Sequence, residues 1–272
     1  MPELPEVETI VKGLRGKVLG RIIKEVQVLE PKMVINSDPF RNKLKDRAIR
    51  RVERQGKAII MQTGQKAYLM VNLGMTGRLI FYPDTAPVDK HTHVLFSFSQ
   101  GGQLIYHDQR QFGRLQLYEG IEPEQIPFVM GLGPDPLDAG FTWQRLAHLL
   151  SKSRRAIKDF LLDQKRIAGI GNIYASEILF HAGIKPLRSA NQLRMEEIKR
   201  LRQAMQGVLR AAIEHRGTSF SDYLDVEGKE GNYKHFLKVY LREGEACSHC
   251  TTRIVRTKLA NRSTYYCPTC QK

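Results

Sequence analysis

The chain has 272 residues, enough for one large domain or two ordinary ones, and its hydrophobic content of 42% excludes wholesale disorder. No run of about eighteen apolar residues occurs and the start lacks the basic-then-apolar pattern of a signal peptide, so we expect a cytoplasmic protein that spans no membrane. The net charge of +15, of which residues 151–272 carry +11, favours a nucleic acid partner, with a generally basic, well-solvated surface as the alternative.

The opening residues, MPELPEVETI, predict the start of a helix. Pro5 suits the first helical position, and Glu6 suits the first turn, where the helix dipole favours an acid. Glu3 and Glu6 would then share a face. Once Met1 is removed, Pro2 carries a secondary amine, and the reference pKa of an α-amino group, roughly 7.7–8.0, leaves part of it neutral and nucleophilic near pH 7. An ordinary capped helix start is the alternative, and these ten residues alone favour it.

Short apolar–polar alternations follow, and they predict β-strands separated by Gly, Pro and Asp turns. They lie at 21–29, 57–63, 66–74, 91–99, 103–107 and 114–118. Many short strands at this spacing indicate a sandwich or a barrel. After the breaker-rich stretch 131–140 the period becomes helical, at 142–152, 156–165, 173–183 and 191–217. Residues 218–236 are predicted to form a long polar loop, whose degree of order the sequence leaves open.

Five positions among the predicted strands stand out for their chemistry. Arg110 and Phe112 lie two apart at a strand end and would share a face, from which they could enter a duplex, with Met75 as a third wedge. The alternative is a core role for Phe112 and Met75, and it is favoured on these residues alone. His91, in KHTHV, is interpreted as a hydrogen-bonding or phosphate-contacting residue. Lys57 begins a strand after a glycine and is normally solvated there, unless a site lowers its pKa.

Two features mark the second half of the chain. In the stretch 167–184, glycines break one helix before another begins near Asn172, which is typical of a phosphate-binding helix–turn–helix or, alternatively, of an ordinary helical hairpin. All four cysteines form C-x2-C pairs at zinc-ribbon spacing: Cys247, Cys250, Cys267 and Cys270. Four thiolates complete a tetrahedral site, so one zinc ion would be structural. Disulfides are the alternative, and a cytosolic chain disfavours them.

Taken in order, these motifs resemble the bacterial formamidopyrimidine-DNA glycosylase family, which repairs 8-oxoguanine by base excision. The resemblance covers the whole chain and rests on PELPEVE (2–8), GMTG (74–77), KHTHV (90–94), DQRQFG (108–113), IKDFLLDQ (157–164), GIGNIYASE (169–177), NRSTYYCPTCQ (261–271) and the cysteine spacing. It implies an α+β fold of two domains. An N-terminal helix and an antiparallel β-sandwich occupy 1–132, a helical domain with a helix–two-turn–helix and a lesion-capping loop near 218–236 occupies 133–236, and a zinc finger occupies 237–272.

The resemblance also implies a bifunctional enzyme. A monomer would bind damaged double-stranded DNA between the domains and flip an oxidised purine out of the stack. It would release the base through a Schiff base on the N-terminal proline and then nick the strand by β,δ-elimination. One structural Zn²⁺ would be its cofactor, and DNA binding would associate it with the bacterial nucleoid.

The resemblance also implies a role for each residue of this chain that matches a functional position of the family. Pro2 would be the nucleophile, Glu3 the general acid/base, and Glu6 would support them. Lys57 would act in base loss and β-elimination, and Arg262, on the zinc-finger hairpin, would grip phosphate and assist δ-elimination. The other site residues would contact DNA: Met75, Arg110 and Phe112 in the space of the everted nucleotide, and His91, Arg154, Lys158 and Asn172 at the backbone.

Three positions depart from the family pattern. Asn72 stands where His is usual, Leu241 stands where Gly is common, and LANRST replaces a Gly-flanked Arg. None removes a proposed catalytic residue, but together they bear on lesion preference and local loop geometry.

Two other functions compete with this interpretation. The sister family of the endonuclease VIII type acts on oxidised pyrimidines, but its start usually has Gly-Pro where this chain has Leu4-Pro5. A non-catalytic zinc-ribbon DNA-binding protein would explain the charge and the cysteines. It would leave Pro2, Glu3 and Lys57 without a reason.

Overall fold

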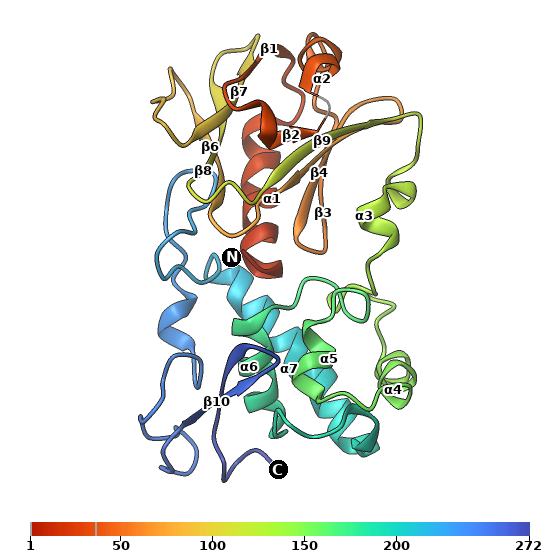
Figure 1. Ribbon diagram of the computed structural model, residues 1–272, viewed down its shortest axis with the longest axis vertical. Helices are drawn as coiled ribbons and strands as arrows, with labels where there is room; N and C mark the ends of the chain where they lie inside the picture. The colour runs from red at the N-terminus through yellow and green to blue at the C-terminus, as the bar shows by residue number, and fades with distance from the viewer. Residues whose placement is uncertain (1, 36) are drawn as a thin grey trace. The chain divides into compact units, whose positions relative to one another are not determined.

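The computed structural model describes residues 2–35 and 37–272, and the chain divides into two compact units. The first unit comprises the residues up to Met130 together with His215–Lys234, and the second comprises Gly131–Glu214 and His235–Lys272 (Figure 1). The family resemblance implies that 218–236 belong to the helical domain. In the structure most of this stretch packs with the first unit, because its partners are residues of the N-terminal helix and of the strand 77–82.

Helix α1 (Leu4–Val18) lies in the core of the first unit. Its buried apolar residues recur at helical spacing: Leu4, Val7, Ile10, Val11, Leu14 and Val18. Glu3 is the N-cap residue, Pro5 lies in the first turn, and Glu6 Oε2 accepts a hydrogen bond from Glu3 N at 2.8 Å. This is a capping box, so the same short motif that marks the start of the chain also fixes the start of the helix.

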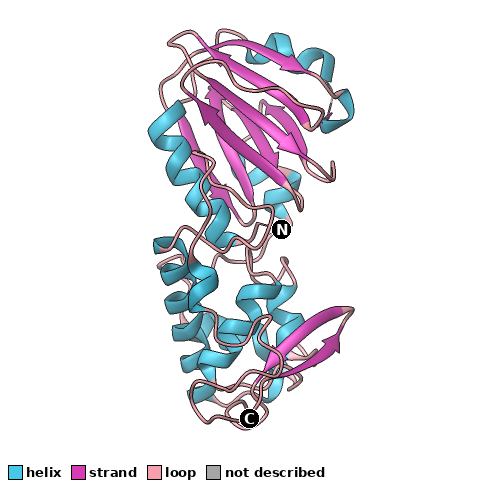
Figure 2. Cartoon of the chain, turned by 90° about the vertical axis from the view of Figure 1, so that its left-hand side faces the viewer, coloured by secondary structure: helices cyan, strands magenta, loops and turns pink. Residues whose placement is uncertain are grey.

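Two sheets share one core with α1. The first sheet has the strand order β1 (Ile23–Val28), β7 (Thr92–Phe98), β8 (Gln103–Asp108), β6 (Gly77–Tyr82). The second has the order β2 (Val34–Ile35), β9 (Arg114–Glu119), β5 (Ala67–Asn72), β4 (Ala58–Gly64), β3 (Arg51–Gln55). All pairs are antiparallel except the short β2–β9 pair. The predicted helix with an antiparallel sandwich is therefore confirmed (Figure 2).

Shorter elements complete the first unit. The 3-10 helix η1 (Pro31–Met33) and helix α2 (Ser37–Leu44) lie between β1 and β3 in the chain, and η2 (Pro123–Gln125) and α3 (Pro127–Met130) follow β9. These elements were not predicted from the sequence, and neither were β2, β3 and β6. In β3, charged residues replace the apolar alternation that marks the other strands.

The second unit is helical and carries a hairpin. Its helices are α4 (Trp143–Ser151), α5 (Ile157–Leu162), α6 (Asn172–Ala182), η3 (Ala190–Gln192) and α7 (Met195–Glu214), and η4 (Tyr233–Phe236) contains a boundary between the units. Gln164 pins the double turn between α5 and α6, because it accepts a bond from Gly169 N and donates to Ile170 O, both at 2.8 Å. Strands β10 (Val255–Leu259) and β11 (Arg262–Tyr266) form the hairpin. No helix of the described residues is long and apolar enough to cross a membrane.

Candidate functional site

The start of α1 is organised around one buried carboxylate, that of Glu6. Its Oε2 accepts from Glu3 N, and its Oε1 accepts from Thr218 N, each at 2.8 Å. Gly217 has φ +79°, and a Cβ there would lie 2.7 Å from Glu6 Oε1, so only glycine fits against the carboxylate. Pro2, Glu3 and Glu6 are all buried. Glu6 therefore fixes the backbone beside Pro2 and joins it to the segment His215–Lys234.

Lys57 lies in the turn between β3 and β4, which is tied to the same helix. The turn is Gly56-Lys57, with Gly56 at φ +57°, and Lys57 is half-buried. Arg54 Nε pairs with Glu8 Oε2 of α1 at 2.9 Å, and Arg54 Nη1 donates to Gly56 O at 3.2 Å. Both side chains of the ion pair are largely buried, which makes this link more rigid than a surface pair. The Lys57 turn is thus held to the helix that begins at Glu3.

The predicted wedge residues lie on two turns that touch. Gly74 has φ +60°, and a Cβ there would lie 2.6 Å from Gly113 N, so the two backbones approach as closely as glycine allows. On these turns Met75 is 37% exposed and Phe112 is 57% exposed, and the Arg110 guanidinium lies 4.8 Å from the centre of the Phe112 ring. Exposure of this size excludes the core interpretation of Met75 and Phe112.

Asp108, which the sequence analysis missed, holds these turns. It is fully buried, and its carboxylate accepts bonds from Thr76 Oγ1, from Gly113 N at 2.9 Å and from Tyr106 OH at 3.1 Å. Arg110 N donates in turn to Thr76 Oγ1 at 3.0 Å. Burial, with the nearby Asp108 charge, raises the pKa of Tyr106 far above its ordinary value, so the phenol stays a donor. The available signal was an acidic residue at a strand end directly before the Arg110 turn.

His91 is half-buried and is oriented by Asp89. His91 N donates to Asp89 Oδ1 at 2.8 Å, and this bond lowers the pKa of Asp89 to about 2. Asp89 Oδ2 lies 3.3 Å from His107 Nε2, and the two histidine rings meet edge to face at 5.6 Å. Burial lowers the pKa of His107, so this ring is neutral at pH 7.

In the second unit, predicted site residues support the hairpin. Lys158 Nζ donates to Ser263 O at 3.0 Å and to Thr264 Oγ1 at 2.9 Å, and Asn172 Nδ2 donates to Ser263 O at 3.1 Å. Lys158 was expected among the phosphate contacts, but its side chain is fully buried. Its ammonium instead donates to residues of β11, the strand that begins at Arg262. The Arg262 side chain itself is exposed. Burying a lysine without such acceptors would be costly.

Arg154 and Arg262 present their side chains on the surface of the second unit. Arg154 lies between α4 and α5 and is exposed. Arg262 follows a two-residue turn, Ala260-Asn261, with φ values of +43° and +61°. Positive φ at both positions is the type I′ turn that matches the twist of a β-hairpin. The predicted DNA-contacting and catalytic residues therefore fall into two groups, one in each unit.

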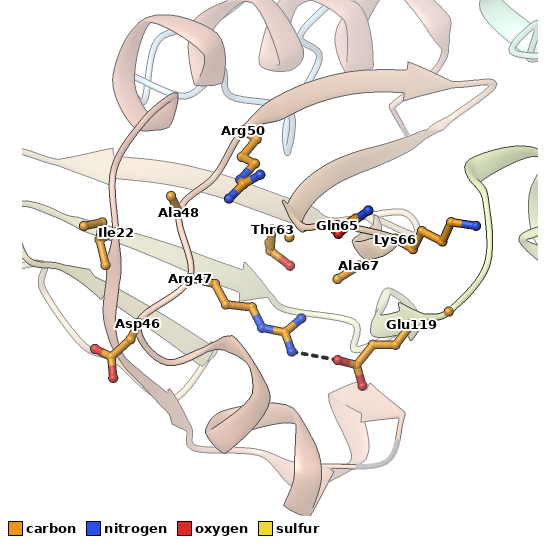
Figure 3. A pocket seen from close by; sticks show the side chains of 12 residues that line it. Ile22, Asp46, Arg47, Ala48, Arg50, Thr63, Gln65, Lys66, Ala67 and Glu119 are labelled. Carbon is orange, nitrogen blue, oxygen red and sulfur yellow. Dashed lines mark hydrogen bonds and ion pairs between the residues drawn. The ribbon is translucent and has the colours of Figure 1, made fainter.

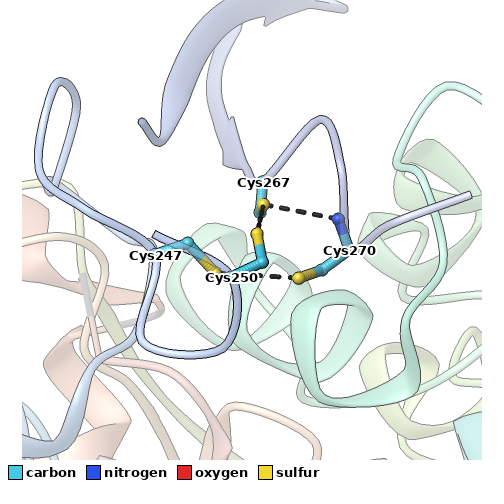
Figure 4. Close-up of side chains that lie close together, drawn as sticks. All are labelled: Cys247, Cys250, Cys267 and Cys270. Atoms are coloured by element: carbon cyan, nitrogen blue, oxygen red, sulfur yellow. Dashed lines mark hydrogen bonds between the residues drawn. The ribbon is translucent and has the colours of Figure 1, made fainter. Parts of the chain in front are cut away.

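The four cysteines form the predicted metal site (Figure 4). Their sulfurs lie within 4.8 Å of one another, and no disulfide joins them. The separations Cys247–Cys270, 3.8 Å, and Cys250–Cys267, 3.5 Å, are close to the edge of about 3.8 Å that a tetrahedron of zinc–sulfur bonds has. The set fits one four-coordinate Zn²⁺ with no open position, so the metal is structural.

A hollow elsewhere in the first unit contains none of the predicted residues (Figure 3). It measures about 660 Å³. Arg47 lies in it and pairs with Glu119 at 2.8 Å, as Figure 3 shows. The candidate site therefore lies at the start of α1 and not in this hollow.

Comparison with known protein families settles the relationship that these features suggest. Residues 1–115 match the model of the formamidopyrimidine-DNA glycosylase N-terminal domain, and residues 132–223 match the H2TH domain of the same enzymes. Residues 244–272 match the zinc finger found in FPG and IleRS. The chain belongs to the formamidopyrimidine-DNA glycosylase family.

Relatives and solved structures of this family cover the chain from end to end. A formamidopyrimidine-DNA glycosylase of Desulforamulus reducens is 43% identical over 100% of this chain and 99% of its own length. That of Moorella thermoacetica is 46% identical over 95% of each chain. A Lactococcus lactis family member in complex with Fapy-dG containing DNA is 34% identical, covers 100% of both chains and has a TM-score of 0.92.

Two departures from the formamidopyrimidine-DNA glycosylase pattern have local explanations. Asn72 Oδ1 accepts from Gly74 N at 3.0 Å, so it shapes the turn that carries Met75. Leu241 has φ +60°, in the left-handed region that favours glycine, which is the residue that the family resemblance leads one to expect at this position.

We expect Leu241→Gly to raise the free energy of unfolding by about 1 kcal/mol. A non-glycine residue in the left-handed region costs roughly 1–2 kcal/mol in the folded state. Glycine removes this cost, but it also gives the unfolded chain more conformational freedom, which offsets part of the gain. The Leu241 side chain is 54% exposed, so little burial is lost. Urea unfolding would measure the change, with Leu187→Gly as the control, because Leu187 is similarly exposed but is not among the positive-φ residues. Equal or lower stability for Leu241→Gly would contradict the prediction.

Proposed function

We propose that this protein is a bifunctional DNA glycosylase of base-excision repair, which removes oxidised purines and nicks the strand. Its family membership supports this function, and one observation carries it: a single carboxylate, Glu6, fixes both Glu3 and the segment that begins near Thr218 around Pro2. A helix cap alone does not require a second, distant segment at that carboxylate. The arrangement fixes the orientation of the chain start, which the attack of the Pro2 nitrogen requires.

The chemistry begins at Pro2, once Met1 has been removed. The neutral amine attacks the sugar C1′ of the damaged nucleotide, the N-glycosidic bond breaks, and Glu3 moves the proton that base release requires. The amine proton leaves through Glu3 and the departing base is protonated. The C1′–O4′ bond then breaks as O4′ takes up a proton, which leaves an iminium link between Pro2 and the opened sugar. Lys57, whose turn is tied to α1 through Arg54, acts in base loss and in the β-elimination that follows.

DNA contacts come from both units. Met75, Arg110 and Phe112 enter the space of the everted nucleotide, which the exposure of the two apolar side chains supports. His91, Arg154 and Asn172 contact the phosphate backbone, with Asn172 at the N-terminal end of α6. Lys158 acts indirectly, because its ammonium supports the hairpin.

Arg262 grips phosphate and assists δ-elimination from the hairpin. When bound, zinc supplies no step of the reaction and holds the chain beside the hairpin in place. Ser263, next to Arg262, is fixed through its carbonyl by Lys158 and Asn172. The strand is thereby anchored one residue from the side chain that has to reach the phosphate.

We place the protein in the bacterial cytoplasm as a monomer on damaged double-stranded DNA. The Lactococcus lactis relatives were solved with DNA containing Fapy-dG, an abasic site and an oxidised pyrimidine. The basic second half suits such a partner, because its charge of +11 would displace counterions from the phosphates.

Cleavage of a panel of matched duplexes tests this function. We expect base release and β,δ-elimination on 8-oxoguanine opposite cytosine, with slower release from an oxidised pyrimidine. Gel analysis of labelled strands reads both steps, because δ-elimination leaves phosphates at both ends of the gap. Action only on the oxidised pyrimidine would support the endonuclease VIII type. Tight binding without cleavage would support a binding module, and either result would overturn the proposal.

A further inference from the structure

The segment His215–Lys234 is a fixed part of the first unit. At its start, Thr218 N donates to Glu6 Oε1, and further on Phe81 N donates to Val226 O, both at 2.8 Å. Val226 fits against Gly13 of α1 so closely that a Cβ on Gly13 would lie 2.3 Å from Val226 Cγ1. The sequence alone leaves the order of this segment open. These contacts attach the segment to α1 and β6.

Between these anchors, Tyr223 is buried in the core of the first unit, and its OH donates to Glu6 O at 3.4 Å. Ser219 is buried, accepts from Gly231 N at 2.9 Å and donates to Tyr223 O at 2.8 Å, so it braces the segment internally. Beyond it, Phe220 is 48% exposed. We call residues 219–222, which lie before Tyr223, the tip.

Arg78 connects the tip to the sandwich. Arg78 Nε, from β6, donates to Asp222 O at 2.5 Å across 144 residues of sequence. The Arg78 side chain is half-buried, and a charged donor to a backbone carbonyl is among the stronger hydrogen bonds in proteins. Arg78 lies three residues beyond Met75, in the strand that follows the Met75 turn. Its hydrogen bond therefore attaches the tip to the part of the fold that carries this wedge residue.

We propose that Arg78 is a positioning residue for base release: it holds the tip where the tip contacts the extruded damaged base. This inference rests on the proposed function. Base release requires the tip to be in place, whereas cleavage at an abasic site has no base to hold. Arg78 therefore acts on the glycosylase step and leaves the lyase step unchanged.

The test compares two substrates with one set of variants. Arg78→Met keeps the apolar stem and removes the donor, and Arg78→Lys returns a donor and the charge. Arg51→Met removes one charge from an exposed arginine of β3 that pairs with Glu53, and it controls for lost charge alone. Single-turnover base release from 8-oxoguanine:cytosine and strand cleavage at a preformed abasic site are measured in the same duplex sequence.

We expect Arg78→Met to slow base release by about tenfold or more while abasic-site cleavage stays within about twofold, with partial recovery in Arg78→Lys and no change in Arg51→Met. Hydrogen exchange should show lost protection of amides near 219–226 in Arg78→Met, with α1 unchanged. A parallel fall in both reactions, or no fall in either, would overturn the inference, as would unchanged exchange at the tip. A wild-type protein that releases no base from any oxidised purine would overturn the proposed function itself and with it this role.

Discussion

A chain that retains Met1 should cleave lesion-containing DNA on the order of 10³-fold more slowly than the processed chain, or slower still. Retention turns the Pro2 nitrogen into a tertiary amide, which has no lone pair available for attack on C1′. The DNA contacts of the two units do not involve this nitrogen, so affinity for the duplex should change little. Pro2→Gly should also weaken cleavage sharply, because the ring that limits the direction of the amine is lost.

Single-turnover cleavage and fluorescence anisotropy on one lesion duplex would measure the two quantities. Enzymatic removal of the retained Met1 provides the matched control, because the same sample should then recover its cleavage rate. Equal cleavage before and after removal would contradict the assignment of Pro2.

Removal of zinc should have the second large effect, and it should be confined to the second unit. Structural zinc contributes roughly 10–16 kcal/mol of binding free energy in zinc-finger peptides, so the four cysteines should not keep their arrangement without it. The β10–β11 hairpin would then lose its support, and Lys158 would lose its acceptors on Ser263 and Thr264. Affinity for DNA should fall on the order of 10²-fold, because several charge-assisted contacts are lost together.

Chelation followed by hydrogen exchange and anisotropy would test this expectation, with Cys250→Ser as an independent route to the same loss. Amides of α1 and of the two sheets should keep their protection, because the described residues of their shared core include none from 237–272. Restored affinity on adding back zinc would complete the test. A metal-free protein with an ordered hairpin and unchanged affinity would contradict it.

The elements that the sequence predicted are those in which one local pattern agrees with the final environment. The stretch 92–98 is buried along nearly its whole length and is bounded by turns. Helix α7 shows a clear amphipathic period. Strand β3 was missed because its side chains, RVERQ, are mostly charged and half-exposed, so its pairing with β4 and not its composition determines the strand. Tertiary pairing overrides propensity there.

The site was predictable where a motif is compact and unpredictable where distant groups combine. The start PELPEVE contains both Glu3 and Glu6, so their spacing predicts that they share a face of the helix. Nothing local links Glu6 with Thr218, or Arg78 with Asp222, because 212 and 144 residues separate them. Lys158 shows the same limit: the family resemblance predicts a phosphate contact for it, and only the fold shows that its side chain is buried against the hairpin.

The most direct test of the account is borohydride reduction during turnover on an 8-oxoguanine:cytosine duplex, followed by mapping of the adduct by tandem mass spectrometry. We predict one covalent protein–DNA species, with the sugar on the nitrogen of Pro2 at the start of a chain that lacks Met1. An adduct on Lys57, or efficient strand cleavage with no trapped species, would contradict it.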